Sequence, residues 1–339
     1  MSDGLTAADE LYSHQLVAPR AVPLHEHPAW AERCYHLLFA GDDLILNAGR
    51  AVYAHDGRRT AFAAAVAGEA LHALRAREAF GPGDDPDRPD VGPVRIEVVA
   101  PLERVRLVLD DPDGPLAFDL VYEARFAPVA TERNLIELKG EVVTDYMNFF
   151  QSGSYSGTVV VEGHEIAVRD RAGFRDRGWG LRKHEGSPRR GLVVFIGAEL
   201  PGSSLYALLY ETASGRRVFT NGWLMDEGGV TDRVVDAEHD LDFDGVLLRG
   251  GRATLDFASG ARREVAIDVR NRLFLSAVGY TADPAGKEPG RGRHDLSDPA
   301  AVDRLVGQTD NGCRFTVDGV AGHGYVETGL GIHARYRPG

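Results

Sequence analysis

Residues 94–128, VRIEVVAPLERVRLVLDDPDGPLAFDLVYEARFAP, alternate apolar and polar side chains on both sides of a turn. The turn DDPDG (110–114) contains Asp, Pro and Gly residues, which adopt turn conformations at little energetic cost. Successive side chains of a β-strand point to opposite faces, so this pattern predicts strands with one buried and one exposed face. The stretch therefore predicts an antiparallel β-meander.

Similar strand-like runs recur along the chain, and most are separated by clusters of Gly, Asp or Ser. They cover residues 134–144, 155–168, 191–200, 204–212, 217–230, 253–269 and 313–336. Many short strands at even spacing favour an antiparallel barrel or sandwich over alternating strand–helix units. The sequence therefore predicts an all-β fold.

Two segments have a helical composition. Residues 60–80, TAFAAAVAGEALHALRAREAF, are rich in Ala and favour a helix by propensity, although the preceding Asp56-Gly57 pair would suit a β-hairpin. In SDPAAVDRLVGQ (297–308), Ser297 or Asp298 can cap a helix whose first turn contains Pro299. We therefore expect one or two short helices. By contrast, ADPAGKEPGRGRHD (282–295) has the composition of a loop.

The chain length and charge limit the classes of protein that fit. At 339 residues two domains are favoured, and a boundary near residue 186 balances the expected strands, giving domains at 1–185 and 186–339. The formal charge of −13 argues against nucleic acid or an anionic membrane surface as the main partner. Neither a membrane-spanning stretch nor a secretory signal is evident, so we expect a soluble, cytoplasmic protein.

Few residues have the spacing of metal ligands or cofactor motifs. Cys34 and Cys313 are the only cysteines, too few for a disulfide framework. Among the scattered histidines only His25 and His27 are close together, and a solvated N-terminal segment explains them more simply than a metal site. Phosphate-binding loops, nucleophile elbows and HExxH motifs are absent from the sequence. We expect neither a metal nor a cofactor.

The densest group of chemically active residues lies in GFRDRGWGLRKHEG, residues 173–186. Gly173 and Gly178 permit tight backbone geometry around Asp176, Arg177 and Trp179. One interpretation is structural, because an Arg stacked on a Trp can close the corner of a lipocalin-like barrel. The other is catalytic, because burial in a dry pocket can raise the pKa of a carboxyl such as Asp176 far enough for general acid catalysis.

A second candidate segment is DYMNFFQSGSYSG, residues 145–157. Tyr146 and Tyr155 offer aromatic surface and Gln151 a polar group, a mixture that suits an apolar ligand cavity. A strand with aromatic core residues is the commoner explanation of this pattern.

A third candidate is GHGYVETG, residues 322–329, in which His323, Tyr325 and Glu327 recur with a period of two. On a strand they would share one face, so all three would be exposed or all three would face an interior. His323 and Glu327 could then form an acid–base pair, although a plain hairpin with polar residues outside is the commoner explanation.

Around GFRDRGWGLR the sequence resembles the carotenoid hydratase (hydroxyneurosporene synthase) superfamily, whose members share an Asp-[His/Arg]-x-Trp-Gly core late in the first domain. NFFQSGSYSGTVVVEGHEIAV (148–168) looks like the strands that precede this core, and CRFTVDGVAGHGYVETG (313–329) looks like the closing segment of the family. WAERCYHLLFAGDD (30–43) resembles the opening strand. The resemblance implies two packed lipocalin-like antiparallel β-barrels.

The resemblance also implies chemistry without redox or metal cofactors: hydration of isolated double bonds, or cyclisation and isomerisation of apolar terpenoid- or polyketide-derived molecules. It makes Asp176 the motif aspartate and Trp179 the motif tryptophan. Arg177 stands where the hydratases have a histidine implicated in catalysis, and an Arg cannot exchange protons near neutral pH, which argues against carotenoid hydration itself.

The resulting hypothesis is an acid–base lyase, hydratase, isomerase or cyclase that acts on an apolar small molecule inside a barrel cavity. Asp176 would be the acid, Trp179 would stabilise cationic character, and Arg177 or Arg182 would hold the carboxylate or a substrate oxygen. Should an ion pair between Arg177 and Asp176 lower the aspartate pKa, His323 or Glu327 would supply the proton. The alternative hypothesis is a lipocalin-like carrier that binds an apolar ligand without transforming it.

Overall fold

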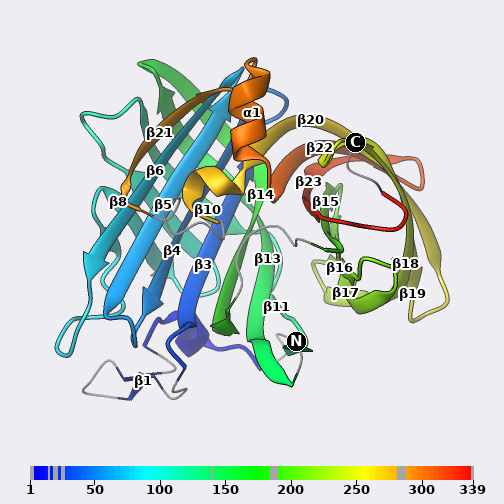
Figure 1. Cartoon of the computed structure of the whole chain (residues 1–339), viewed down its shortest axis with the longest axis horizontal. Helices are drawn as coiled ribbons and strands as arrows, with labels where there is room; N and C mark the ends of the chain where they lie inside the picture. Colours follow the sequence, from blue (N-terminus) through cyan, green and yellow to red (C-terminus); the bar gives the residue numbers. More distant parts are fainter. Residues whose placement is uncertain are drawn as a thin grey trace.

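The computed structural model describes residues 4–13, 16–17, 22–23, 27–138, 140–183, 190–280 and 288–336. Two curled antiparallel sheets account for most of this part of the chain and pack side by side (Figure 1). The predicted all-β fold with two barrel-like units is confirmed.

The first unit is a long curled sheet. In spatial order its strands are β21 (Gly290–Asp295), β6 (Ala70–Ala79), β5 (Arg58–Ala67), β4 (Leu44–Tyr53), β3 (Trp30–Phe39), β14 (His164–Arg182), β13 (Glu141–Val161), β10 (Leu116–Ala124), β9 (Arg104–Leu109), β8 (Val94–Ala100) and β7 (Asp90–Val91). Two further strands, β11 (Val129–Ala130) and β12 (Asn134–Leu138), pair with β13. A separate small sheet contains β1 (Leu16–Val17) and β2 (Val22–Pro23).

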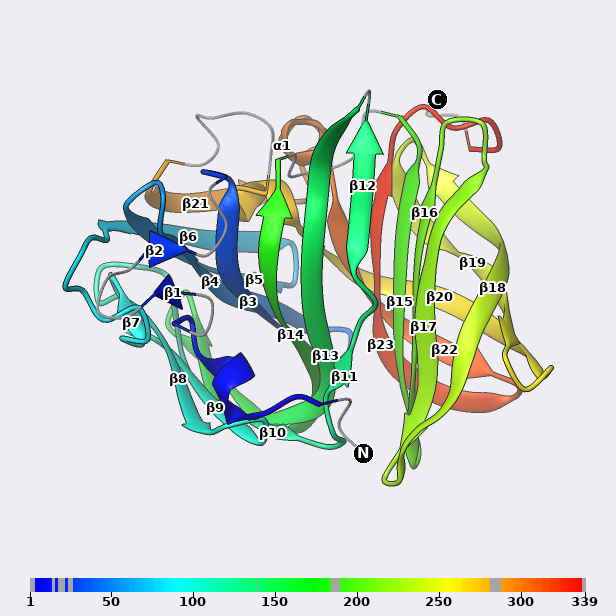
Figure 2. The same cartoon turned by 90° about the horizontal axis from the view of Figure 1, so that it is seen from below.

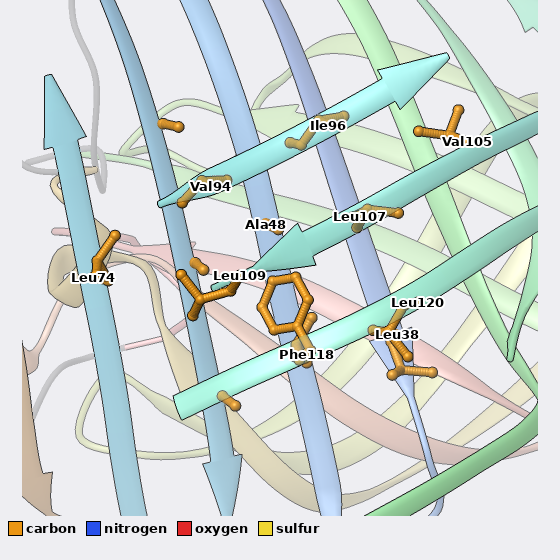
Figure 3. Packing of buried hydrophobic residues seen from close by; sticks show 14 of the residues in the cluster. Leu38, Ala48, Leu74, Val94, Ile96, Val105, Leu107, Leu109, Phe118 and Leu120 are labelled. Atoms are coloured by element: carbon orange, nitrogen blue, oxygen red, sulfur yellow. The ribbon is translucent and has the colours of Figure 1, made fainter. Parts of the chain in front are cut away.

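The interior of the first sheet contains the apolar half of the alternating pattern in residues 94–128. Ile96, Leu107 and Phe118 are buried, whereas Arg106 and Asp119 on the other face are exposed and form an ion pair. Figure 3 shows the side chains of β8, β9 and β10 packed against those of β3, β4 and β6 across the curl. The predicted meander is therefore confirmed, and its buried face forms one wall of this core.

The second unit is a closed barrel. Around the barrel its strands are β15 (Leu192–Leu200), β16 (Ser203–Glu211), β17 (Arg217–Asp226), β18 (Gly229–Asp244), β19 (Leu247–Phe257), β20 (Arg262–Phe274), β22 (Thr309–Val317) and β23 (Val320–Leu330). Its lumen is filled by apolar side chains such as Ile196, Leu255 and Phe315. The lumen is thus a packed core.

In the described part of the chain three short helical segments accompany the strands: η1 (Ala7–Glu10), η2 (Leu275–Val278) and α1 (Pro299–Leu305). The α1 helix confirms the prediction for residues 297–308, since the side chain of Asp298 accepts a hydrogen bond from the backbone N–H of Ala300 and Pro299 occupies the first turn. None of the helices in the described residues has the length and apolar character needed to span a membrane.

The helix favoured for residues 60–80 is wrong: this segment forms the β5–β6 hairpin, which turns at residues 68–69. Its strands are buried on both faces. Ala63 and Ala65 pack into the interior of the first sheet, whereas Ala64 and Ala73 face the second unit. Small side chains are needed on both faces of this hairpin, so its alanines reflect close packing and not helix propensity.

The two units meet across an aromatic core. Phe174 of β14 stacks on Tyr325 of β23 with ring centroids 4.6 Å apart, and Phe39 of β3 stacks on the same tyrosine at 5.4 Å. Phe195 packs against Phe174 and Tyr325 edge to face. Strands β14 and β3 both contact β23 along this line. Figure 2 shows the first sheet and the barrel side by side.

One strand crosses between the units. The predicted boundary at residues 185–186 lies outside the described residues, but β21, far beyond it in sequence, pairs with β6 at the edge of the first sheet. Residues 290–295 were expected to belong to a loop, and this part of the expectation is wrong. GRGRHD lacks an alternating apolar pattern because the strand is held by backbone pairing and by ion pairs such as Arg291–Asp111 and Arg293–Glu162.

The aromatic contact between the units predicts a large loss of stability for Phe174→Ala. Removing this buried ring should lower the free energy of unfolding by about 3–5 kcal/mol. Denaturant unfolding would measure the loss, with Phe219→Ala on the less buried face of β17 as the matched control. Equal losses in the two variants would contradict a special role for the contact.

Candidate functional site

A cavity of about 230 Å³ lies between the two units. Its walls come from β3, β4, β5, β6, β12, β13 and β14 of the first sheet and from β15, β16 and β23 of the barrel, and η2 and the two residues after it add to the lining. The cavity is therefore on the outer face of the first sheet, and not in a barrel lumen as expected from the sequence.

Strand register sets which side chains reach the cavity. In β14 the even-numbered residues Phe174, Asp176 and Arg182 line it. Asp176 lies opposite Tyr35 of β3 and Phe150 of β13, so one row of cross-strand neighbours places a carboxyl, a phenol and an aromatic ring side by side. The register therefore brings the motif aspartate to a wall that contains aromatic rings.

The glycines of the motif make room for aromatic rings. A Cβ atom on Gly178 would lie 2.1 Å from the hydroxyl oxygen of Tyr146, so that phenol rests directly over the glycine on the cavity face. On the opposite face, a Cβ atom on Gly173 would lie 2.4 Å from the ring of Tyr155. Each glycine lets a tyrosine lie flat against the sheet.

Asp176 is a half-buried carboxyl whose exposed surface faces the cavity. Burial raises its pKa to about 7, and the nearby charge of Glu327 adds to this effect. The charges of Arg182 and Arg177 and a hydrogen bond with Asn148 oppose the rise in pKa. At neutral pH both the acid and the carboxylate forms are populated, which is the condition for efficient proton transfer.

Two further carboxyls enter from the barrel. Glu327 of β23 lines the cavity and accepts a hydrogen bond from the side chain of Gln308. Asp310 of β22 is fully buried and accepts a hydrogen bond from the hydroxyl of Tyr35, which in turn accepts one from the side-chain amide of Asn47. Burial raises the pKa of both carboxyls, and the charge of Glu327 raises that of Asp310 further.

Arg182 is the basic group placed nearest these acids. It donates a hydrogen bond to the hydroxyl of Tyr280, and its guanidinium lies 5.1 Å from the ring centre of Tyr146. Its charge lowers the pKa values of both Asp176 and Glu327. Arg182 therefore lines the cavity close enough for its charge to act on both carboxyls.

Arg177 points away from the cavity. Its guanidinium forms a buried ion pair with Glu32 at 2.5 Å and stacks on the ring of Tyr12 at 4.4 Å. It also donates hydrogen bonds to the backbone carbonyls of Leu11, Arg33 and Gly178. The ion pair considered between Arg177 and Asp176 is not formed, and Arg177 instead fixes the N-terminal segment to the inner face of β14.

The structure separates the other predicted residues from the cavity. Gln151 is buried on the inner face, where its side chain accepts hydrogen bonds from Arg175 and donates to the carbonyls of Leu102 and Phe126. Tyr155 lies on the same face, within hydrogen-bond distance of His36 at 3.2 Å. Trp179 shares the odd-numbered face of β14 and does not line the cavity.

The remaining candidates are at the surface or outside the described residues. His323 is exposed and lies outside the cavity, although it shares β23 with Glu327. His25 is not among the described residues, whereas Nδ1 of His27 accepts a hydrogen bond from the backbone N–H of Ala29. Within the described ranges no group of three or more His, Cys, Asp or Glu side chains could hold a metal ion. Cys34 and Cys313 are both free and buried.

Sequence reasoning missed Tyr35, Asn148 and Asp310. Tyr35 lies within WAERCYHLLF, which signalled only a strand, and Asp310 comes from a segment with no motif. Asn148 could have been predicted from the sequence, since it shares the even-numbered face of β13 with Tyr146 and Phe150. Period-two counting along this strand would have selected it.

The fold and the cavity together define a double-calycin type of protein, in which two lipocalin-like units pack around a cavity at their junction. The chain belongs to a family of unknown function (DUF8625), whose model matches residues 5–294. A search of curated proteins found no match.

Two solved structures resemble the chain in fold. One is a protein from Nitrosomonas europaea provisionally named AttH, with a TM-score of 0.57, 14% identity, and coverage of 93% of this chain and 98% of the other. The second is kievitone hydratase from Nectria haematococca, with a TM-score of 0.55, 12% identity, and coverage of 88% of each chain. The resemblance to the double-calycin superfamily is thereby confirmed for the fold.

The raised pKa of Asp176 predicts a pH-dependent stability difference. Asp176 stays protonated in the folded state at pH values where an ordinary aspartate has lost its proton. Its protonation therefore stabilises the folded state fully below about pH 4, and this contribution is lost as the pH rises through about 7. Between these values the free energy of unfolding should fall by up to about 1.4 kcal/mol per pH unit more in the wild type than in Asp176→Asn. Chemical denaturation at several pH values would measure it, and parallel curves would contradict the assignment.

The buried pair of Arg177 and Glu32 predicts a second stability effect. Arg177→Met leaves the Glu32 carboxylate without its partner and should cost about 3–5 kcal/mol at pH 8. Burial already holds the pKa of Glu32 at about 7 despite the arginine, so protonation should lessen the loss at low pH. The double variant Arg177→Met/Glu32→Met should recover much of the stability. A double variant as unstable as the single one would contradict this account.

Proposed function

We propose that this protein is a cofactor-independent acid–base enzyme that protonates an apolar small molecule in the cavity between its units, and that hydration of a double bond, or the reverse elimination, is its reaction. Asp176 is the proton donor in this proposal. The observation that carries it is the position of Asp176, a half-buried carboxyl, on a cavity wall that also contains several aromatic rings.

The surroundings of Asp176 support a role as general acid. Its pKa of about 7 keeps a protonated population at neutral pH, whereas an ordinary aspartate is almost fully ionised there. The pocket excludes bulk water on one side through Phe150 and Phe174. In such surroundings a positioned acid contributes a rate factor of roughly 10²–10⁴.

The aromatic walls support a cationic intermediate. When the proton of Asp176 adds to one carbon of a double bond, the positive charge appears at the other carbon. Tyr35, Phe62 and Tyr146 line the cavity and present ring faces that attract a cation. Trp179, predicted for this role, lies on the opposite face of β14, so these rings take it over.

The same carboxyls accept the proton that is released in the hydration step. Water adds to the carbocation, and the proton it loses passes to the carboxylate of Asp176 or Glu327, so no net proton is consumed. Arg182 holds the ionised carboxylate during this step because its charge acts on both acids. Isomerisation or cyclisation would share the first protonation and differ in which bond forms next.

The fold likeness to kievitone hydratase agrees with this class of reaction, although it rests on 12% identity and therefore on shape alone. Within the proposal Arg177 is a positioning residue that fixes β14 from behind. The carotenoid-type catalytic histidine has no counterpart at this position.

The proposal predicts that Asp176→Asn abolishes proton transfer but not binding. The test incubates the protein in D₂O with a panel of alkene-bearing terpenoids and polyketides and follows deuterium and water uptake by mass spectrometry. Turnover should fall by about 10²–10⁴ in Asp176→Asn. The control Asp113→Asn makes the same chemical change on an exposed turn and should retain activity.

The outcome separates an enzyme from a carrier. If panel molecules bind to the wild type and are recovered without deuterium or added water, the protein is a lipocalin-like carrier and the proposal fails. Full activity in Asp176→Asn would also contradict the assignment of the acid.

A further inference from the structure

Asp310 is a fully buried carboxyl to which the proposed chemistry assigns no part. It lies directly opposite Glu327 in the pairing of β22 with β23, so the two carboxyls are cross-strand neighbours. Two carboxylates placed side by side away from water repel each other, and one of them then keeps its proton. Glu327 reaches the cavity whereas Asp310 is completely buried, so the negative charge is better placed on Glu327 and the proton on Asp310.

The pKa of Asp310 agrees with this placement of the proton. Burial raises it well above the usual aspartate value, and the charges of Glu327 and Asp176 add to the rise. Hydrogen bonds with Tyr35 and Asn47 act in the opposite direction. A carboxylic acid that stays neutral in an apolar site has an O–H group and can donate a hydrogen bond, which a carboxylate cannot do.

Tyr35 connects Asp310 with the cavity. Its side chain is half-buried and lines the cavity wall, and its hydroxyl oxygen accepts a hydrogen bond from the side-chain amide of Asn47 at 2.9 Å. The same hydroxyl is hydrogen-bonded to Asp310 and donates to it when the carboxyl is ionised. When Asp310 is protonated, the acid donates to the phenol oxygen instead. The phenol hydrogen is then free to turn towards the cavity.

The surroundings make Tyr35 a strong donor of this hydrogen. Its oxygen then accepts hydrogen bonds from both Asn47 and Asp310, and hydrogen bonds in a chain strengthen one another. The rings of Phe62 and Phe174 lie with their centres 6.0 and 6.1 Å from that of Tyr35, so the donor has apolar neighbours. A ligand that displaces water from this hydroxyl therefore binds best when it offers an acceptor in return.

The acceptor that suits this position is neutral. Burial, together with the charges of Asp310 and Glu327, raises the pKa of Tyr35 well above its usual value. This means that negative charge at the phenol oxygen is disfavoured, and the same surroundings disfavour an anionic ligand oxygen beside it. A carbonyl oxygen accepts hydrogen bonds without carrying a charge, and therefore meets both conditions.

We propose that the substrate of this cavity is an apolar molecule with a carbonyl group, and that Tyr35 donates a hydrogen bond to the carbonyl oxygen. Asp310, in its acid form, is a positioning residue that acts through Tyr35. Asp176 lies directly opposite Tyr35 on the neighbouring strand, so the bound carbonyl lies close to the proposed acid. This inference rests on the proposed function for the location of the substrate, but the hydrogen bond itself requires no proton transfer.

The test compares 1-tetralone, labelled with ¹³C at its carbonyl, with tetralin, which has the same ring skeleton and no oxygen. In the full chain the NMR resonance of the bound carbonyl should lie downfield of its position in an apolar solvent, because a hydrogen bond polarises the carbonyl. Tyr35→Phe should remove this shift and weaken tetralone binding about 2- to 12-fold in titration calorimetry, the contribution of one neutral hydrogen bond. Tetralin should bind both proteins equally, which shows that the cavity is intact.

Tyr122→Phe is the matched control, because Tyr122 is a fully buried tyrosine whose hydroxyl donates to the backbone carbonyl of Gln151 and which is not part of the cavity wall. It should leave the carbonyl resonance unchanged. An unchanged resonance and affinity in Tyr35→Phe, or no binding of tetralone to the wild type, would overturn the inference.

Asp310→Asn tests the direction of the inner hydrogen bond. The amide donates to the oxygen of Tyr35 as the acid does, so the carbonyl resonance and the affinity for tetralone should both be retained. A resonance that moves further downfield in this variant would show that Tyr35 donates to Asp310 in the wild type, and would contradict the inference.

Asp176→Asn separates this inference from the proposed function. It should keep the carbonyl resonance that depends on Tyr35 while it loses turnover of the alkene panel. A wild type that shows this resonance but turns over no alkene would support the carbonyl inference and contradict the proposed function. Turnover together with a resonance that does not depend on Tyr35 would do the reverse.

Discussion

The second half of strand β14, residues 173–182, is largely buried on both faces, and the rest of the molecule depends on what each face contacts. Its odd-numbered side chains form the ionic lining of the first sheet, where Arg175 pairs with Glu10 and Arg177 with Glu32. Its even-numbered side chains form the junction with the barrel, where Phe174 packs and Asp176 meets the cavity. A shift of register by one residue would exchange the two sets and place two arginines in the aromatic junction.

Buried acidic and basic groups form ion pairs on the inner face of β14, whereas at its outer face burial raises the pKa of the carboxyls. On the inner face each arginine has a carboxylate within 2.5 Å and further backbone or amide acceptors, so its charge is compensated where water is absent. On the outer face the charge of Glu327 raises the pKa of both Asp176 and Asp310, and the charge of Asp176 raises that of Asp310 further. The charge of Arg182 opposes the rise at Asp176 and at Glu327. The inner face therefore stabilises the fold, whereas the outer face holds protons that can be transferred near neutral pH.

Alternation along the sequence predicted the strands that have one exposed face, such as β9 and β10, since their polar residues mark the outside. Alternation failed in β5 and β6, because alanines that are buried on both faces show no period of two. It also failed in β21, which has no apolar face and is held at the sheet edge by backbone pairing and ion pairs. The motif segment contributes Asp176 and Arg182 to the cavity, but the sequence analysis treated its residues as one group. The same period of two separates Asp176 from Arg177 and Trp179. Tyr35 and Asp310 required the topology, because strands distant in sequence bring them together.

The location of the acids makes chemistry dependent on the packing of the two units. Asp176 belongs to the first sheet, Glu327 and Asp310 to the barrel, and the Tyr35–Asp310 hydrogen bond joins the two. The aromatic stack of Phe39, Tyr325 and Phe174 runs beside them, and Tyr325 shares its strand face with Glu327. A change in this stack would alter how close the carboxyls approach and thus how far their pKa values rise. The junction that stabilises the pair of units therefore also sets the acidity of the site, and neither unit alone contains the complete set of carboxyls.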